Sequence, residues 1–176
     1  MKPIILDRDG VINQDSDAFI RSVADWVPIP GSLEAIARLS QAGFDVFVFT
    51  NQSGLARGLF DATTLAAIHA RMTAAIEAAG GQLRGIYACP HGPDDGCLCR
   101  KPLPGLLHQI AQDFDIDWPG VPVIGDSRRD LEAALAVGAR PMLVETGKGQ
   151  RTLHDGLPRP AEVFPDLARA VDHLLA

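Results

Sequence analysis

The feature of this sequence that most constrains its fold is a regular alternation of short apolar runs and longer amphipathic segments. The short runs are rich in Val, Ile, Leu and Phe and are apolar on both faces, as expected of strands buried in a parallel sheet. We predict strands at residues 3–7, 45–50, 85–88, 121–125 and 141–144. We predict helices at residues 32–42, 62–79, 105–114, 129–137 and 165–175. This alternation predicts a Rossmann-like, doubly wound, three-layer α/β/α fold with a parallel sheet.

Residues typical of helix ends support these boundaries. Ser32 suits the N-cap of the first helix, and Gly43 can end that helix in a left-handed conformation. Gly80 is placed to close the second helix in the same way, and Gly138 the fourth.

The chain is predicted to form one domain over residues 1–176, because its length is typical of one and no repeat or linker divides it. The segments after the first and second predicted strands are short, so we expect no separate cap domain and an open site that accepts an extended substrate.

Charge and hydropathy argue against several classes of partner. The net charge is −6 and the basic residues are dispersed, which is unlike a nucleic-acid-binding surface. No apolar run approaches the roughly 20 residues of a membrane span, and the N-terminus lacks the layout of a signal peptide. We therefore expect a cytoplasmic protein, and a monomer because no exposed apolar stripe stands out.

Two aspartates follow the first predicted strand. Asp7 and Asp9 lie just beyond a buried apolar run, where two carboxylates are costly to hold together without a cation. Gly10 then allows a sharp exit of the chain. Taken alone, the pair is equally compatible with a polar strand end followed by a turn.

Polar residues follow the later strands in the same way. Thr50 and Asn51 offer groups that suit phosphate oxygens, although alone they also suit a turn or a helix cap. Lys101 precedes Pro102, which disfavours a helical conformation and lets the lysine project from an extended segment. Asp126 ends the fourth strand, where it could also cap a helix. Together these residues make the set needed for phosphoryl transfer through an aspartyl-phosphate.

In this order, the residues resemble the four motifs of the haloacid dehalogenase-like (HAD) phosphatase superfamily: Asp7-x-Asp9-Gly10, Thr50-Asn51, Lys101-Pro102 and Gly125-Asp126. More narrowly, the stretches DRDGVIN, TNQSGLARG, CPHGP with CLCRKP, and GDSRRD resemble the heptose-bisphosphate phosphatase family. The resemblance implies hydrolysis of the C7 phosphate of D-glycero-D-manno-heptose 1,7-bisphosphate, on the route to ADP-heptose and the lipopolysaccharide core.

The resemblance also implies catalytic roles. Asp7 is the expected nucleophile, and Asp9 protonates the leaving oxygen and then activates water. Magnesium is expected to bind the carboxylates of Asp7 and Asp126 and the main-chain carbonyl of Asp9. The residues expected to stabilise the transferring phosphoryl group are Thr50, Asn51 and Lys101.

Substrate contacts are implied by the matching loops. The residues concerned are Asp15, Ser16, Asp17, Ala18, Asn51, Gln52, Ser53 and Arg100. We add Arg57 as a contact for the distal phosphate. The family often has lysine after the fourth-motif aspartate, where this chain has Ser127. Arg128 or Arg129 can supply that charge, or the site works without it.

The three cysteines gather in one short segment, residues 89–99, before the third motif. Cys89 and His91, with Cys97 and Cys99, offer the ligands of a closed, tetrahedral structural zinc site. Free thiols in a loop are the alternative. In the resembled family this loop binds structural zinc. The other histidines, His69 among them, are expected to have ordinary surface or boundary roles.

Two other functions fit parts of the pattern. Histidinol-phosphate phosphatases have a similar zinc loop, and comparing turnover on the two substrates separates the families. A non-hydrolysing, phospho-accepting signalling domain also combines acidic residues, a hydroxyl and a lysine on a doubly wound sheet. Such domains lack an acid/base two residues after the nucleophile and lack the zinc loop, so Asp9 favours hydrolysis.

Overall fold

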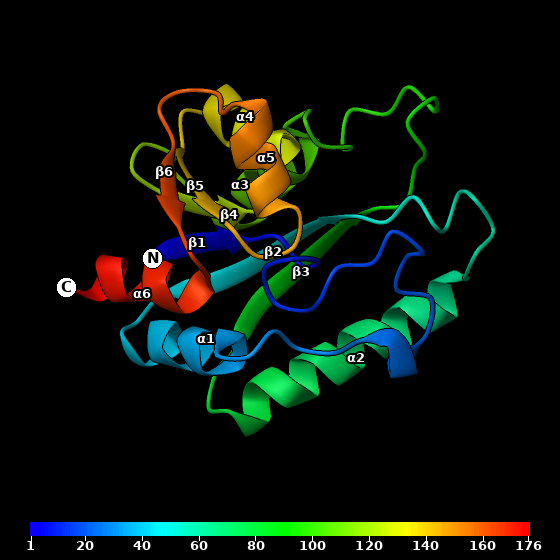
Figure 1. Cartoon of the computed structure of the whole chain (residues 1–176), viewed down its shortest axis with the longest axis horizontal. Coiled ribbons are helices and arrows are strands. Elements are labelled where there is room, and N and C mark those ends of the chain that lie inside the picture. Colours follow the sequence, from blue (N-terminus) through cyan, green and yellow to red (C-terminus); the bar gives the residue numbers. More distant parts are fainter.

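The computed structural model describes all 176 residues and has one six-stranded, wholly parallel sheet (Figure 1). The strands run in the order β3-β2-β1-β4-β5-β6. Their bounds are β1 Pro3–Leu6, β2 Asp45–Asn51, β3 Leu83–Cys89, β4 Pro122–Gly125, β5 Arg140–Val144 and β6 Glu162–Phe164. The parallel, doubly wound sheet confirms the predicted fold class, while the short edge strand β6 was not predicted.

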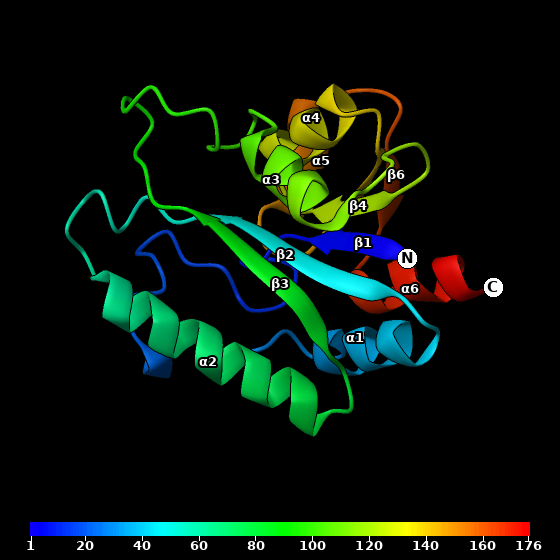
Figure 2. The same ribbon diagram turned by 180° about the vertical axis from the view of Figure 1, so that it is seen from behind.

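Helices cover both faces of this sheet. Their bounds are α1 Ser32–Gln41, α2 Ala62–Ala78, α3 Gly105–Phe114, α4 Arg128–Ala136, α5 Gly149–Asp155 and α6 Leu167–Leu175, with a 3-10 turn η1 at Val23–Asp25. Helices α1, α2 and α6 lie on one face, and α3, α4 and α5 lie on the other (Figures 1 and 2). No helix combines the length and apolarity that crossing a membrane requires.

The two faces of the sheet bury two separate hydrophobic clusters. Ile4 and Leu6 of β1 belong to the cluster under α1, α2 and α6, whereas Ile5 between them belongs to the cluster under α3 and α4. In β2, Val46 belongs to the first of these clusters and Phe47 to the second. Because successive side chains of a strand point to opposite faces, central strands covered on both sides must be apolar throughout. This explains the continuous apolar runs of the sequence.

One helix cap differs from the prediction. The N-cap of α1 is Gly31, in a left-handed conformation with a φ of 86°, and not Ser32. Ser32 is the first helical residue, and its hydroxyl donates to the main-chain oxygen of Val11 at 2.7 Å. It therefore ties α1 to the loop after β1. Gly43, which has a φ of 80°, follows α1 in the left-handed conformation that was predicted.

The strand order creates a switch point beside β1. The chain leaves β1 for β2 and β3 on one side, then crosses back to β4 on the other. Ligands of such sheets bind beyond the carboxyl ends of the strands at this point. Asp7, Thr50 and Asp126 all lie at these ends.

Candidate active site

The floor of the site is a buried lysine between two aspartates. Lys101 donates from Nζ to Asp7 Oδ1 at 3.0 Å and to Asp130 Oδ1 at 2.6 Å. It also donates to the main-chain oxygen of Phe49 at 3.1 Å. All three charged side chains are buried. Burial, with the charge of Asp130 next in importance, raises the pKa of Asp7 well above its usual value, and Lys101 opposes this shift.

Three carboxylates of this floor could hold a cation. Oxygen atoms of Asp7, Asp126 and Asp130 all lie within 4.8 Å of one another. Burial, assisted by the charge of Asp130, raises the pKa of Asp126 to about 7. A Cβ atom at Gly10 would overlap the carboxylate of Asp126, so only glycine leaves the space open. Crowded oxygen ligands of this kind suit a hard cation such as Mg²⁺.

The carboxylate of Asp9 is surrounded by hydrogen-bond donors. Arg8 donates from Nε to Oδ1 at 2.8 Å and from Nη2 to Oδ2 at 3.1 Å. Asn13 Nδ2 donates to Oδ1 at 2.9 Å, and Gln52 Nε2 donates to Oδ2 at 3.1 Å. Neither Arg8 nor Asn13 was predicted from the sequence. The available signal was a charged residue inside an apolar strand end, which must have a buried partner.

The end of β2 supplies the Thr50 hydroxyl and the Asn51 side-chain amide, which binds the backbone of Lys101. Thr50 Oγ1 accepts a hydrogen bond from Gln52 Nε2 at 2.8 Å, which leaves its own hydrogen free to donate to a phosphate oxygen. Asn51 accepts from the main-chain N–H of Lys101 at 3.0 Å and donates to its carbonyl at 3.1 Å. The Asn51 amide therefore fixes the backbone that carries Lys101, and one of its N–H groups remains for a ligand.

A polar pocket opens above the floor. Of the residues predicted to contact substrate, those that line it are Asp15, Ser16, Asp17, Asn51, Gln52, Ser53, Arg57 and Arg100. Ala18 does not line it but faces a neighbouring hollow, because its N–H bonds the Ser16 hydroxyl at 3.1 Å and closes a local turn. The pocket also includes Lys148, whose Nζ lies 3.4 Å from Asp15 Oδ2.

Three arginines line this pocket without a carboxylate partner. Arg57, Arg100 and Arg129 form no ion pair within 4.0 Å. Burial lowers the pKa of Arg100, and the charges of Arg129 and Arg57 lower it further. Guanidinium groups that repel one another in this way favour a bound anion.

The position after Asp126 has a structural role. Ser127 donates from Oγ and from its main-chain N–H to Asp130 Oδ2, at 2.9 and 3.0 Å, and caps α4. Asp126 is therefore not the helix cap. Of the two arginines considered as substitutes for a lysine here, Arg128 pairs with Glu132 at 2.6 Å on the exposed surface, and only Arg129 lines the pocket.

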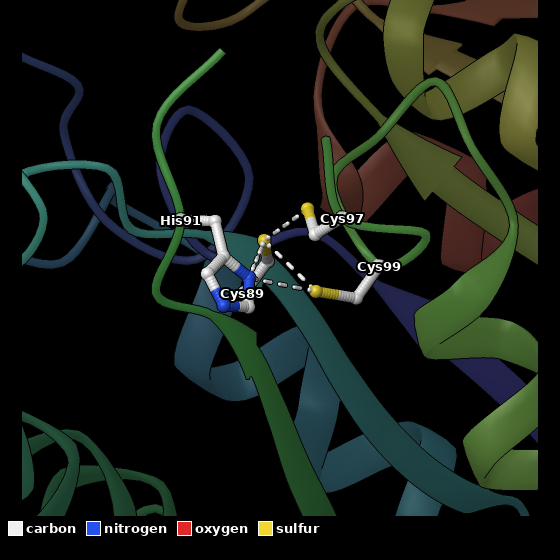
Figure 3. A group of neighbouring side chains, drawn as sticks. All are labelled: Cys89, His91, Cys97 and Cys99. Atoms are coloured by element: carbon white, nitrogen blue, oxygen red, sulfur yellow. Dashed lines mark hydrogen bonds between the residues drawn. The ribbon is translucent and has the colours of Figure 1, made fainter. Parts of the chain in front are cut away.

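The cysteine segment forms a compact cluster whose four side chains point toward one another (Figure 3). Cys89 Sγ lies 3.1 Å from Cys99 Sγ and 3.8 Å from Cys97 Sγ. His91 Nδ1 lies 3.3 Å from Cys99 Sγ. Two sulfurs bound tetrahedrally to one zinc at about 2.3 Å would be about 3.8 Å apart. The separation of Cys89 and Cys97 matches this value, and that of Cys89 and Cys99 is shorter. All three cysteines are free, and their separations are too long for disulfides.

Comparison with known proteins agrees with this geometry. Residues 98–170 match the HAD-hydrolase-like family model, and residues 4–126 match the polynucleotide kinase 3 phosphatase model. The D-glycero-beta-D-manno-heptose-1,7-bisphosphate 7-phosphatase of Bordetella bronchiseptica is 58% identical over 99% of this chain and 98% of its own. The corresponding protein of Pseudomonas putida is 57% identical over 99% and 100%. The chain belongs to the heptose-bisphosphate phosphatase family of HAD-like hydrolases.

Two solved structures share the fold described above. A crystal structure of the B. bronchiseptica protein, complexed with magnesium and phosphate, superposes with a TM-score of 0.98 over 99% of this chain and 98% of that one. A haloacid dehalogenase from Xanthobacter autotrophicus, at 10% identity, has a TM-score of 0.66 over 100% and 99% and shows the fold alone.

Proposed function

We propose that this chain hydrolyses the C7 phosphate of D-glycero-β-D-manno-heptose 1,7-bisphosphate, in the formation of the ADP-heptose precursor of the lipopolysaccharide core. Its relatives carry that name at 55–58% identity, and the β anomer is part of it. We further infer that residues 1–176 act as one domain and as a cytoplasmic monomer.

The observation that supports the proposal is the charge of the pocket lining, which we infer to form two anion-binding poles. Asp7, Lys101 and Asp126 form its floor, and Arg57, Arg100 and Arg129 contribute unpaired positive charge to its lining. A bisphosphate needs one pole for the phosphoryl group that reacts and another for the phosphate that stays. A polynucleotide substrate is less compatible with the chain, whose net charge is −6.

The proposed reaction has two displacements. In the first, a carboxylate oxygen of Asp7 attacks phosphorus, the bond to the C7 oxygen breaks, and Asp9 gives that oxygen a proton. In the second, Asp9 takes a proton from water, the water oxygen attacks phosphorus, and Asp7 leaves as a carboxylate with inorganic phosphate released. Proton transfer of this kind typically contributes about 10²–10⁴-fold. Lys101 and Thr50 would stabilise the phosphoryl oxygens in both steps.

Two metals are part of the proposal. Asp7 and Asp126, with the main-chain carbonyl of Asp9, would hold Mg²⁺, which screens the negative charge of the phosphoryl group and the carboxylates. The cluster of Cys89, His91, Cys97 and Cys99 would hold Zn²⁺, which keeps a segment without helix or strand in one conformation. Cys99 leads directly into Arg100 and Lys101, so this cluster would orient both cations.

The test is phosphate release from the α- and β-heptose 1,7-bisphosphates, with histidinol phosphate as the comparison and phosphorus NMR to show which phosphate leaves. We expect loss of the C7 phosphate alone, faster from the β anomer. Arg100→Gln should lower kcat/KM for the bisphosphate about tenfold but leave heptose 7-phosphate nearly unchanged, because an ionic hydrogen bond contributes about 1.5–3 kcal/mol. Faster turnover of histidinol phosphate would overturn the substrate assignment.

A further inference from the structure

Arg8 is a fully buried charge that contacts no substrate-facing surface. It stands between the two aspartates of the site, yet its side chain is 0% exposed and is absent from the pocket lining. A buried guanidinium is costly unless its donors are paired. Its Nε and Nη2 both donate to Asp9, at 2.8 and 3.1 Å, and Asp9 is its one ion-pair partner. Arg8 thus holds the Asp9 carboxylate through two of its nitrogens, and Nη2 also lies 2.8 Å from Oδ1.

The third nitrogen of the Arg8 guanidinium group, Nη1, contacts a histidine of α2. Arg8 Nη1 lies 3.2 Å from His69 Nε2. Because a guanidinium group only donates hydrogen bonds, Nε2 must be the acceptor, and the ring must carry its proton on Nδ1. Burial lowers the pKa of His69 to about 4, and the positive charge of Arg8 contributes to this. His69 is therefore neutral near pH 7. It is half-buried, a boundary position as expected, but its contact with Arg8 was not predicted from the sequence.

The two contacts connect helix α2 to the proposed acid/base, because His69 contacts Arg8 and Arg8 contacts Asp9. His69 belongs to α2, a well-packed helix of 17 residues whose Ile68 and Met72 are fully buried. His69 does not line the pocket, and its hydrogen-bonded connection to the site is Arg8. Charge-assisted contacts from Nε and Nη2 of Arg8 hold the Asp9 carboxylate in position. Misplacing a catalytic group by about 1 Å can cost about 10²-fold in rate.

We propose that Arg8 and His69 are a positioning pair that holds the Asp9 carboxylate in the geometry needed for proton transfer. The inference rests on the acid/base role proposed for Asp9. His69 anchors Arg8 to α2, and Arg8 aligns Asp9 toward the oxygen that leaves. Asn13 and Gln52 complete the set of donors around that carboxylate.

The test compares two leaving groups. A sugar alkoxide needs a proton as it leaves, whereas 4-nitrophenolate is stable enough to leave unaided. The value of kcat/KM covers only the steps up to release of the leaving group, so it isolates the acid role of Asp9. The variants are His69→Leu, which removes the acceptor, and His69→Gln, whose side-chain oxygen can accept from Arg8. Met72→Leu is the control, because it changes a fully buried apolar residue of α2 and leaves the hydrogen bonds of Arg8 in place.

In His69→Leu, kcat/KM for heptose bisphosphate should fall ten- to hundredfold, on the order of the cost of a misplaced group. With 4-nitrophenyl phosphate it should change less than about twofold, since no proton donor is then needed. His69→Gln should restore most of the loss, and Met72→Leu should behave as wild type. Equal losses on both substrates, or no loss on either, would overturn the positioning role.

Asp9→Asn separates this inference from the proposed mechanism. It should lower kcat/KM far more for the sugar phosphate than for the aryl phosphate. If Asp9→Asn shows no such selectivity, the acid role itself is wrong and the positioning pair falls with it. If Asp9→Asn is selective and His69→Leu is not, only the positioning pair is wrong.

Discussion

At the residue scale, Lys101 balances the charge of the pocket floor. It contacts Asp7 and Asp130 at hydrogen-bond distance, and its Nζ lies 4.0 Å from the centre of the Phe49 ring. The pKa of Lys101 is raised: burial opposes its charge, but the two aspartates outweigh that effect. One buried cation thus serves two buried carboxylates, and each of the three depends on the others.

Removing that cation should destabilise the fold as well as the reaction. In Lys101→Met, without added magnesium, two buried carboxylates lose their partner, and the free energy of unfolding should fall by about 3 kcal/mol. Urea unfolding measures this, with the more exposed Lys148→Met as the control. Phosphatase activity should fall by at least about 10²-fold, as when a group that stabilises transition-state charge is removed. A variant as stable as wild type would contradict the pairing.

The lowered pKa of His69 predicts that the free energy of unfolding depends on pH. Its pKa is about 4 in the folded state and about 6.5 when unfolded, so below pH 6.5 the unfolded state binds more protons. The free energy of unfolding should therefore fall as the pH is lowered from 7 to 5, by on the order of 1 kcal/mol from this residue. His69→Gln cannot titrate here and should lose that much less over the same range. Parallel curves for the two proteins, from urea unfolding at each pH, would refute the assignment.

At the element scale, the sequence predicted five of the six strands and five of the six helices to within about two residues at most ends. Central strands and amphipathic helices have a period that the sequence displays directly. The elements that were missed, α5 and β6, are short, polar or at an edge of the sheet, so their position depends on tertiary contacts. Arg140 in β5, for example, pairs with Glu162 of β6 at 2.6 Å, a contact between distant residues.

The residues of the site also divide into those that could be predicted from the sequence and those that could not. Asp7, Thr50 and Asp126 could be predicted because each lies at the carboxyl end of a strand, and parallel strands end at one edge. Lys101 could be predicted from its place before Pro102 and from the family motif. The role of His69 could not, because it lies in the middle of a helix, where a histidine near an arginine 61 positions away leaves no local pattern. Arg129 could be assigned only once the structure showed which of two neighbouring arginines lines the pocket.

The segment of residues 89–99 is predicted to bind one structural zinc ion. Metal analysis of protein purified without chelator should find about one zinc per chain, bound independently of magnesium, because four ligands close a tetrahedral site. Cys99→Ser should lose most of that zinc and lower kcat/KM, since Arg100 and Lys101 follow directly. Leu98→Ser, at an exposed position of the same segment, should keep both. Protein that is fully active without zinc would contradict this role.

At the scale of the whole molecule, the fold explains why the chemistry is concentrated at one edge. The switch point between β1 and β4 brings Asp7 and Asp126 together, although 119 residues separate them. The cysteine cluster begins at Cys89, the last residue of β3, and its segment leads into Lys101 near the same edge. The strand ends supply the carboxylates of Asp7 and Asp126, and the loops supply Arg57, Arg100 and Lys101.

The central claim is that the phosphoryl group passes through Asp7. The most direct test is to quench turnover of heptose bisphosphate in acid within milliseconds and to sequence the phosphorylated peptide by mass spectrometry. We predict one added phosphoryl group on Asp7 in wild type. With 4-nitrophenyl phosphate, whose leaving group needs no acid, Asp9→Asn should accumulate more of it, because water lacks its base. Asp7→Asn should remain folded and show no turnover. Phosphate release with no phosphoryl group on Asp7, together with activity in Asp7→Asn, would contradict the mechanism.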